Sequence, residues 1–388
     1  MTHRIVLPRI LETGAGAIKR LPSLLETLGC RNPLIVTDRV MLSLGYVDLL
    51  TDILKTEGIT GGLFVDTEPE PTERSLLPAV EQVREGQYDA IIALGGGSAI
   101  DSAKAIAVLG PHGGRMADYK APRDVSEAGL PVIAIPTTAG TGSEATRFTI
   151  ITDAESDEKM LCMGLAFMPW AAIIDYELTL SAPARVTADT GIDALTHGIE
   201  AYVSQKASPF SDQQALAAIA LLAPNLRRVY HDPEDREARE AMMLGSCLAG
   251  IAFSNASVAL VHGMSRPIGA HFHIPHGLSN AMLLPAVTRY SIPGAPERYA
   301  QCARTMGVAE LEDDDATANE KLLVELRALN QELQVPSMAE FGIDQAVFMK
   351  LRALMAEQAL ASGSPSNNPR VPDQAEMIEL YEQVWNQE

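Results

Sequence analysis

The segment Tyr88-Asp-Ala-Ile-Ile-Ala-Leu-Gly-Gly-Gly-Ser-Ala-Ile-Asp-Ser-Ala-Lys104 decides the fold, because an apolar run, three glycines and a helical pattern follow one another directly. Without side chains, the backbone of residues 95–97 can approach a pyrophosphate closely, and the first N–H groups of the following helix favour an anion. The segment therefore predicts a dinucleotide or another phosphorylated ligand. It is not the G-x-G-x-x-G fingerprint, so a plain tight turn remains the alternative for this segment taken alone.

Three more apolar runs surround this segment, at residues 33–38, 62–66 and 131–136, and turn residues follow each of them. Residues 72–84 lie between the second run and the segment above, and they have a helical pattern with Thr72 as the N-cap. Strand, helix and strand in this rhythm predict a parallel sheet with helices on its faces.

A second cluster of glycines and hydroxyl residues, Pro136-Thr-Thr-Ala-Gly-Thr-Gly-Ser-Glu144, follows the run at 131–136. The carboxyl ends of parallel strands are where open α/β sheets bind ligands, so this cluster is a second candidate for nucleotide binding. Threonines that only cap turns are the alternative. Asp38, at the end of the first run, is placed to accept hydrogen bonds from an adenosine ribose and to repel a 2′-phosphate, which favours NAD over NADP.

From about Ala184 the pattern changes to long helical stretches rich in Ala and Leu, such as 211–222 and 319–330, with almost no strand. We therefore predict an α/β dinucleotide-binding domain at 1–183 and a helical metal- and substrate-binding domain at 184–388. The acidic run 310–315 is expected to be a solvated loop. Residues 362–369 are expected to form a loop of unusual length.

Composition excludes several classes of partner. The chain of 388 residues is 47% hydrophobic, which is enough for a large core, and its formal net charge is −20. Nucleic acid and membrane surfaces are not expected as partners, because both attract Lys and Arg. Neither a signal peptide nor about 18 consecutive apolar residues is found. The scattered cysteines, without a CxxC pair, suit free thiols in a reducing compartment, so a cytoplasmic location is expected.

The histidines are concentrated in a way that indicates a metal site. The chain has 8 histidines, and four of them, His262, His271, His273 and His276, lie in one short window. Asp193 and His197 are four residues apart in a helical pattern, so both project from one face and can bind the same ion. A carboxylate with imidazoles suits Fe(II) or Zn(II), with a position left open for a substrate oxygen. A hydrogen bond on a helix surface is the alternative for this pair, and spacing alone does not select among the four histidines.

Together, these motifs make the chain resemble the iron-containing (group III) alcohol dehydrogenases. The likeness runs nearly end to end, through Val36-Thr-Asp38, Gly95-Gly-Gly-Ser98, Pro136-Thr-Thr-Ala-Gly-Thr141, Asp193-Ala-Leu-Thr-His197, Pro275-His-Gly277 and Asn368-Pro-Arg370. The resemblance implies the dehydroquinate synthase-like fold, with an α/β nucleotide-binding domain, an all-α domain, and a cleft that holds metal and nicotinamide. It also implies NAD(H), iron or sometimes zinc, and a homodimer.

The resemblance also assigns individual residues. Asp193, His197, His262 and His276 match the metal ligands of the family, whereas His271 and His273 do not. The residues that match nucleotide contacts are Gly96, Gly97, Ser98, Thr137, Thr138, Thr141 and Lys159, with Asp38 at the adenosine ribose. Gly95 and Asp101 in the first motif, and Thr146 just after the second, are further candidates for cofactor binding. Phe253 matches an aromatic residue near the nicotinamide and the substrate.

Two positions depart from the family pattern. Members often have a histidine with a part in proton transfer four residues after the third ligand, where this chain has Arg266, and arginine stays protonated at any working pH. A polar asparagine of one member is replaced by Phe148. We hypothesise that Arg266, with His271 or His273, selects a substrate with an anionic group beside its aldehyde. An ion pair of Arg266 with a local carboxylate is the alternative.

The function expected from these features is metal-dependent, NAD(H)-linked interconversion of a small alcohol and its aldehyde or ketone. Glycerol dehydrogenases, maleylacetate reductases and dehydroquinate synthases resemble the same family and are the nearest alternatives. Maleylacetate reductases are regarded as metal-free, so four retained ligands argue against that subgroup. A non-catalytic nucleotide or metal sensor is the alternative from a different class, and an NADH oxidation assay would separate it from an enzyme.

Overall fold

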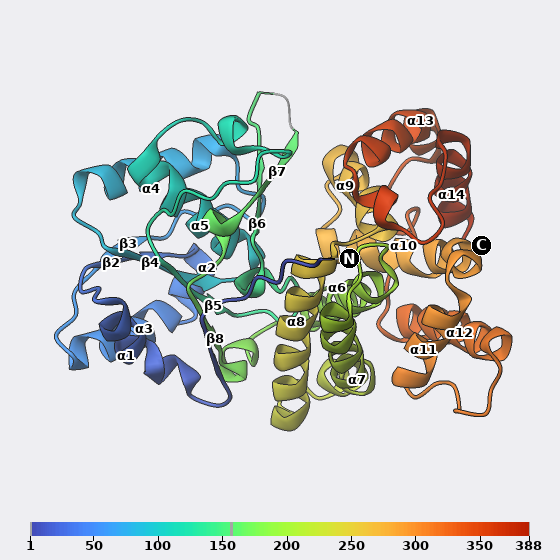
Figure 1. Cartoon of the computed structure of the whole chain (residues 1–388), viewed down its shortest axis with the longest axis horizontal. Helices are drawn as coiled ribbons and strands as arrows, with labels where there is room; N and C mark the ends of the chain where they lie inside the picture. The colour runs from blue at the N-terminus through green and yellow to red at the C-terminus, as the bar shows by residue number, and fades with distance from the viewer. Residues whose placement is uncertain (1, 156–157, 388) are drawn as a thin grey trace. The chain divides into compact units, whose positions relative to one another are not determined.

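The computed structural model describes residues 2–155 and 158–387. Within this part, the chain forms two compact units, the first at Ile5–Pro183 and the second at residues 184–387 with residues 2–4 (Figure 1). The first unit is built on a parallel sheet and the second is helical, so the predicted fold class is confirmed.

The main sheet of the first unit has six parallel strands in the order β1-β8-β5-β4-β2-β3. Their bounds are β1 Ile10–Thr13, β2 Pro33–Val36, β3 Gly62–Phe64, β4 Ala90–Gly95, β5 Val132–Pro136 and β8 Ala171–Ile174. A separate antiparallel hairpin is formed by β6 Phe148–Thr152 and β7 Lys159–Met163. The apolar runs predicted as strands are thus β2, β3, β4 and β5, while β1, β6, β7 and β8 were not predicted.

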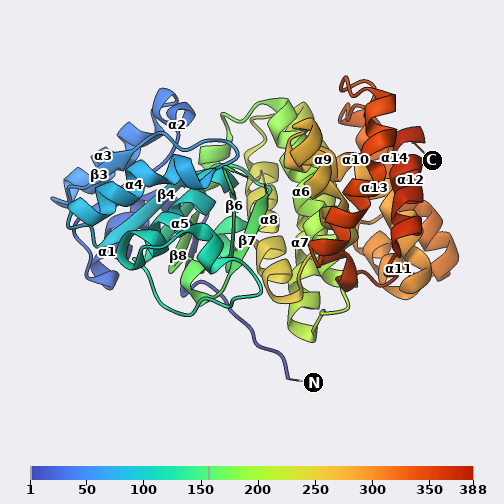
Figure 2. The ribbon, with the colours of Figure 1, turned by 90° about the horizontal axis from the view of Figure 1, so that it is seen from above.

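Helices cover both faces of the main sheet (Figures 1 and 2). Their bounds are α1 Leu21–Leu28, α2 Arg39–Ser43, α3 Tyr46–Thr56, α4 Glu73–Glu85 and α5 Gly97–His112. Leu34 and Val36 of β2 pack with α4 and α5, whereas Ile35 packs with α1 and α3. Because side chains alternate along a strand, this double burial explains why the strand reads as a continuous apolar run.

The predicted helix at 72–84 is confirmed as α4. Thr72 is its N-cap: the Thr72 hydroxyl accepts a hydrogen bond from Ser75 N at 3.1 Å, and Ser75 Oγ accepts one from Thr72 N at 3.1 Å. This reciprocal capping box satisfies two backbone donors at the start of the helix.

The second unit consists of helices, as predicted for the residues after Ala184. Their bounds are α6 Ala184–Val203, α7 Pro209–His231, α8 Arg236–Ala256, α9 Leu260–Phe272, α10 His276–Ser291, α11 Pro296–Thr305, α12 Asp315–Glu332, α13 Gln345–Ala361 and α14 Gln374–Asn386. The stretches 211–222 and 319–330 lie inside α7 and α12. The acidic run is irregular up to Asp314, whose side chain accepts a hydrogen bond from Thr317 N and caps α12.

The segment 362–369 is more ordered than a plain loop. It contains a short 3-10 turn, Ser364–Asn367, and buries Asn367 and Asn368. The Asn367 amide donates to Val258 O just before α9, at 3.0 Å. In the described residues no single helix is long and apolar enough to span a membrane, and only α8 and α9, bent by 101° at their break, pass that test as a pair. The four cysteines are buried, and none of them forms a disulfide within the described residues.

Candidate metal and nucleotide sites

Helices α6, α9 and α10 are part of the second unit (Figure 1), and they bring an acid and three histidines together. Asp193 and His197 come from successive turns of α6, His262 from the first turn of α9, and His276 is the first residue of α10. One potential ligand atom from each residue lies within 4.8 Å of the others. The four residues that the resemblance implies as ligands therefore form one cluster.

The cluster fits a divalent cation by its chemistry. The Asp193 carboxylate lies 3.9, 3.5 and 3.9 Å from Nε2 of the three histidines, at 197, 262 and 276 respectively. Burial raises the pKa of Asp193, but the nearby His197, His276 and His262 outweigh this effect and lower it, so the carboxyl is ionised. A carboxylate and imidazole nitrogens suit Fe(II) and Zn(II). The His276 side chain is 43% exposed, which leaves the cluster open on one side.

Glu200 was not singled out from the sequence, yet it orients one of these histidines. It is buried on α6, and its Oε2 lies 2.6 Å from Nδ1 of His262. Its two oxygens also accept hydrogen bonds from Ala259 N at 2.9 Å and Val261 N at 2.6 Å. Because a carboxylate only accepts, Nδ1 of His262 carries a proton and Nε2 is left to face the cluster. The only signal in the sequence was a glutamate three residues after His197.

Asn280 also reaches the cluster, from one turn after His276. Its amide nitrogen donates to Asp193 Oδ1 at 2.6 Å and lies 3.2 Å from Nε2 of both His262 and His276. Asn280 is fully buried, and its Oδ1 has no hydrogen-bond partner in the described residues. A buried amide oxygen without a partner, next to potential ligand atoms, indicates that the cluster is arranged to receive a positively charged group.

Gly277 permits α10 to begin beside α6. A Cβ atom at this position would lie 2.5 Å from the Asp189 carbonyl oxygen and 3.4 Å from Cβ of Asp193. The Asp189 backbone cannot move away to relieve a contact of 2.5 Å. Only glycine at position 277 therefore lets His276 approach the ligands of α6.

Arg266 and Phe253 lie beside the cluster on two different helices. Phe253 of α8 stacks on the His197 ring, with 4.3 Å between ring centroids. Arg266 is half-buried on α9, four residues after His262 and therefore on the same face of the helix. Among the described residues it forms no hydrogen bond or ion pair; burial lowers the pKa of its guanidinium, and the charge of Glu200 opposes this shift.

His271 and His273 lie outside the ligand cluster. His271 is nine residues after His262, which places it about 180° around α9, and its Nε2 lies 2.8 Å from Gln358 Oε1. His273 ends the helix with a left-handed backbone, φ 54°, and is exposed. A part for either residue in substrate selection stays a prediction.

In the first unit, the two loops rich in glycine lie against each other. A Cβ atom on Gly97 would lie 2.8 Å from Cγ2 of Thr141, and one on Gly96 would lie 3.6 Å from the Thr138 side chain. Thr137 N donates to Gly95 O at 3.0 Å. The N-terminus of α5 and the threonine side chains thus meet at the carboxyl ends of β4 and β5, where a pyrophosphate is expected.

The other residues expected at the nucleotide have local partners. Asp38 caps α2, and its Oδ1 accepts hydrogen bonds from Val40 N at 2.8 Å and Met41 N at 2.9 Å. Ser98 Oγ donates to Pro69 O. Lys159 pairs with Glu70 at 2.7 Å. Contact of Asp38, Ser98 or Lys159 with a nucleotide stays a prediction.

Asp101 and Thr146 point into the protein. Asp101 Oδ1 accepts a hydrogen bond from Ser143 Oγ at 2.6 Å, and Oδ2 accepts one from Ile150 N at 3.0 Å. Thr146 is buried, and its hydroxyl binds the ammonium of Lys104. Phe148 starts β6, and its carbonyl accepts a hydrogen bond from the same ammonium at 2.7 Å. Direct contact of Asp101, Thr146 or Phe148 with a nucleotide or substrate stays a prediction.

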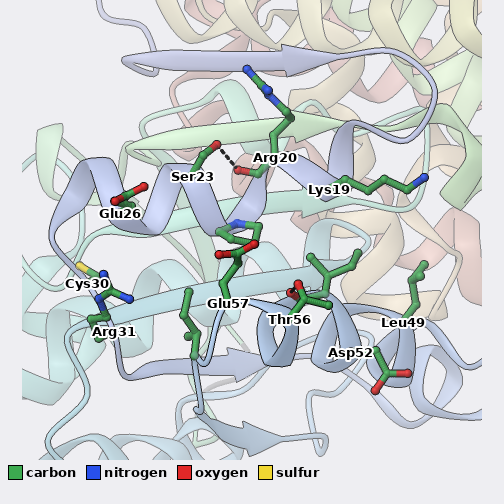
Figure 3. Close-up of a pocket in the computed structure, with 13 residues that line it drawn as sticks. Lys19, Arg20, Ser23, Glu26, Cys30, Arg31, Leu49, Asp52, Thr56 and Glu57 are labelled. Atoms are coloured by element: carbon green, nitrogen blue, oxygen red, sulfur yellow. Dashed lines mark hydrogen bonds between the residues drawn. The ribbon is translucent and has the colours of Figure 1, made fainter.

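A surface pocket of about 650 Å³ lies on the first unit between α1 and α3 (Figure 3). Its charged lining is mixed, with Lys19, Arg20 and Arg31 beside Glu26, Asp52 and Glu57. None of the residues expected at the metal, nucleotide or substrate lines this pocket.

Comparison with known proteins gives matches along nearly the whole chain. Residues 8–176 match the model of iron-containing alcohol dehydrogenases, and residues 187–385 match that of the C-terminal part of the Fe-containing alcohol dehydrogenase family. The chain is 39% identical to long-chain-alcohol dehydrogenase 1 of Geobacillus thermodenitrificans over 93% of this chain and 92% of that protein.

Solved structures agree with this assignment. A 1,3-propanediol oxidoreductase matches with a TM-score of 0.95 and 33% identity, over 99% of this chain and 100% of that one. A sulfoacetaldehyde reductase from Bifidobacterium kashiwanohense, in complex with NAD+, matches with a TM-score of 0.90 and 26% identity over 100% of both chains. The protein is therefore an oxidoreductase that belongs to the iron-containing alcohol dehydrogenase family.

Proposed function

We propose that the protein is a metal-dependent, NAD(H)-linked enzyme that interconverts a small alcohol with its aldehyde or ketone. The observation that carries the proposal is the cluster of Asp193, His197, His262 and His276, whose ligand atoms lie within 4.8 Å of one another. Residues 95–97, the glycine loop, contact residues 137–142, the threonine loop, and this contact supports nucleotide binding. Membership of the iron-containing family supports iron, with zinc as the second candidate.

When bound, the metal supplies a Lewis acid for the substrate oxygen and the nicotinamide supplies or accepts the hydride. The residues of the chain hold and orient these groups. Glu200 directs Nε2 of His262 toward the cluster. Phe253 covers one face of the His197 ring and excludes water there. Arg266 cannot release a proton at neutral pH, so proton transfer must use another group or water.

The proposed preference for NAD over NADP rests on Asp38 at the end of β2. Its carboxylate would repel a 2′-phosphate. The neighbouring Arg39 does not compensate, because it forms an ion pair with Asp66 at 2.6 Å.

The proposal also includes a homodimer. The outer edge of β1 pairs with no other strand in the described residues, and Leu11 on β1, with Ile5 and Leu7 just before it, is exposed. An open strand edge with apolar neighbours is suited to pairing with a second copy. A solution mass of twice 41.6 kDa would support this part of the proposal, and a mass of 41.6 kDa would contradict it.

The test of the proposed function is NADH oxidation by metal-free protein that is reloaded separately with Fe(II) or Zn(II). We expect turnover of short aldehydes only after reloading, with NADH preferred to NADPH. Turnover that survives complete metal removal would contradict the proposal and favour a maleylacetate reductase-like enzyme. A preference for NADPH would contradict only the assignment of Asp38.

We further propose that the substrate carries an anionic group, such as a carboxylate, sulfonate or phosphonate, next to its carbonyl-bearing carbon. Arg266 supports this class, because a half-buried guanidinium without a hydrogen bond or ion pair to any described residue is costly to leave unpaired. Its position one turn after His262 places it close to the metal ligands. Glu200, whose charge acts on Arg266, is already held by His262 and two backbone N–H groups.

Replacement of Arg266 by glutamine should lower kcat/KM for a carboxylated aldehyde by about 10- to 100-fold, because a charge-assisted hydrogen bond is worth roughly 1.5–3 kcal/mol. A neutral aldehyde of the same length should change by less than about threefold, since it makes no such contact. Arg289→Gln, at an exposed position of α10, is the matched control for loss of one positive charge. An equal loss on both aldehydes would show that Arg266 does not select the substrate.

A further inference from the structure

Lys104 is a fully buried lysine in the nucleotide-binding unit that the mechanism above does not use. It lies on α5, two turns after the glycine loop, with a relative exposure of 0%. Its ammonium has three N–H donors and lies within hydrogen-bond distance of five acceptors: Ser143 O at 2.7 Å, Ser143 Oγ at 3.0 Å, Thr146 O at 3.0 Å, Thr146 Oγ1 at 3.0 Å and Phe148 O at 2.7 Å. Every acceptor belongs to the segment 143–148.

Asp101 holds the same segment from one turn earlier on α5. Its carboxylate accepts hydrogen bonds from Ser143 Oγ at 2.6 Å and Ile150 N at 3.0 Å. Its backbone oxygen accepts one from Thr149 Oγ1 at 2.8 Å. Asp101 and Lys104 therefore fix both ends of a stretch of eight residues, 143–150, against one helix.

The surroundings explain why a lysine is needed at this position. Residues 143–147 are irregular, with a short 3-10 turn at Ser143–Ala145 before β6, so the Ser143 and Thr146 carbonyl groups lie outside the strand pairing. Burial lowers the pKa of Lys104 to about 8, while Asp101 and Glu144 oppose that shift, so the ammonium is charged at neutral pH. A charged donor with three N–H groups binds several carbonyl and hydroxyl oxygens of this segment at once, which an apolar side chain cannot do.

This anchor acts on both loops of the nucleotide site. The segment continues directly from the threonine loop, and Thr141 Oγ1 accepts a hydrogen bond from Ser143 N at 3.3 Å. Thr141 in turn lies against Gly97, the first residue of α5. The glycine loop continues into α5, Lys104 of α5 binds Ser143, and Ser143 adjoins the threonine loop. These connections thus set the distance between the two loops.

We propose that Lys104, with Asp101, is a positioning residue that locks the threonine loop to the N-terminus of α5 and so fixes the pyrophosphate-binding geometry. The inference rests on the proposed function only in taking these loops as the nucleotide site. It also gives Asp101 and Thr146 a role through the loop, in place of direct contact with the nucleotide.

The test compares Lys104→Met with the parent enzyme, both loaded with metal, by NADH titration and by steady-state kinetics. Met fills a similar volume without donating a hydrogen bond. We expect the Kd and KM for NADH to rise at least about tenfold, because a misplaced loop loses backbone contacts to the phosphates, while kcat at saturating NADH changes less than about threefold.

Two further variants make the result decisive. Ile106→Ala removes a buried side chain from the same helix but touches none of these hydrogen bonds, so it should lower Tm and leave the Kd for NADH unchanged. Ser143→Ala removes a partner of both Lys104 and Asp101 and should raise the Kd about threefold or more; it decides the matter if Lys104→Met does not fold. An unchanged Kd in a folded Lys104→Met, or in Ser143→Ala, would overturn the positioning role. Failure of the parent enzyme to bind NADH would instead contradict the proposed function.

Discussion

Asp193→Asn should abolish stoichiometric metal binding and lower the turnover of aldehydes by at least about 10³-fold. Asp193 supplies the only carboxylate among the four clustered residues, and it is 1% exposed. Asparagine keeps the shape of the side chain but removes the negative charge that would balance a divalent cation, which neutral imidazoles cannot do. The variant should remain folded, because the amide can still accept the hydrogen bond from Asn280 that Asp193 accepts at 2.6 Å.

The measurement is the metal content per chain, determined together with NADH oxidation and the thermal midpoint. Asp189→Asn is the matched control, because Asp189 lies one turn earlier on α6 and its carboxylate pairs with Arg185 at 2.5 Å, outside the cluster. The control should keep its metal and its turnover. One metal per chain in Asp193→Asn, with activity within tenfold of the parent, would contradict the assigned site.

The parallel sheet was predictable where its strands are buried on both faces. Residues 33–36 and 90–95 read as unbroken apolar runs because α1, α3, α4 and α5 cover them on both sides. The short strands β1 and β8 gave no such signal. β1 is an edge strand of four residues with alternating exposure, and β8 has only Ala171-Ala-Ile-Ile174. Their assignment depends on pairing with each other and with β5, which is not a local property.

The metal cluster was predictable in part from spacing. Asp193 and His197 share a helix face, so a pattern of four residues was enough to pair them. The choice of His262 and His276 depends on the break between α9 and α10, where His273 takes a left-handed conformation and His276 begins a new helix. Spacing treats the four histidines of this window alike, and the resemblance to a family was needed to separate them.

Glu200 and Lys104 show what spacing and motifs do not reveal. Each lies in a helix whose neighbouring residues were recognised, but its partners are at least 39 residues away in the sequence. A glutamate or lysine in a helix is usually exposed, and nothing in a single sequence marks these two as buried. Their roles follow only from the hydrogen bonds that the fold allows.

Glu200→Gln should weaken metal binding by about 10- to 100-fold, or about 1.4–2.7 kcal/mol. Both oxygens of Glu200 accept hydrogen bonds from backbone, Oε1 from Val261 N at 2.6 Å and Oε2 from Ala259 N at 2.9 Å. A glutamine amide therefore places its NH₂ group against a backbone donor in either orientation. This contact leaves a buried donor unsatisfied and should also lower the stability of the metal-free protein by about 1–3 kcal/mol.

The loss of metal affinity has a separate cause in the histidine ring. Where the NH₂ group faces Nδ1 of His262, the ring is driven to the tautomer with its proton on Nε2, and that proton points at the ligand atoms.

Calorimetric titration of the metal-free protein with Zn(II) measures the affinity without relying on activity. Ser204→Ala is the control, because Ser204 donates to Ala256 O at 2.6 Å near the same turn but does not contact His262. It should lower Tm and leave the affinity unchanged. If Glu200→Gln lowered Tm alone, as Ser204→Ala should, the carboxylate would support the turn before α9 without orienting His262.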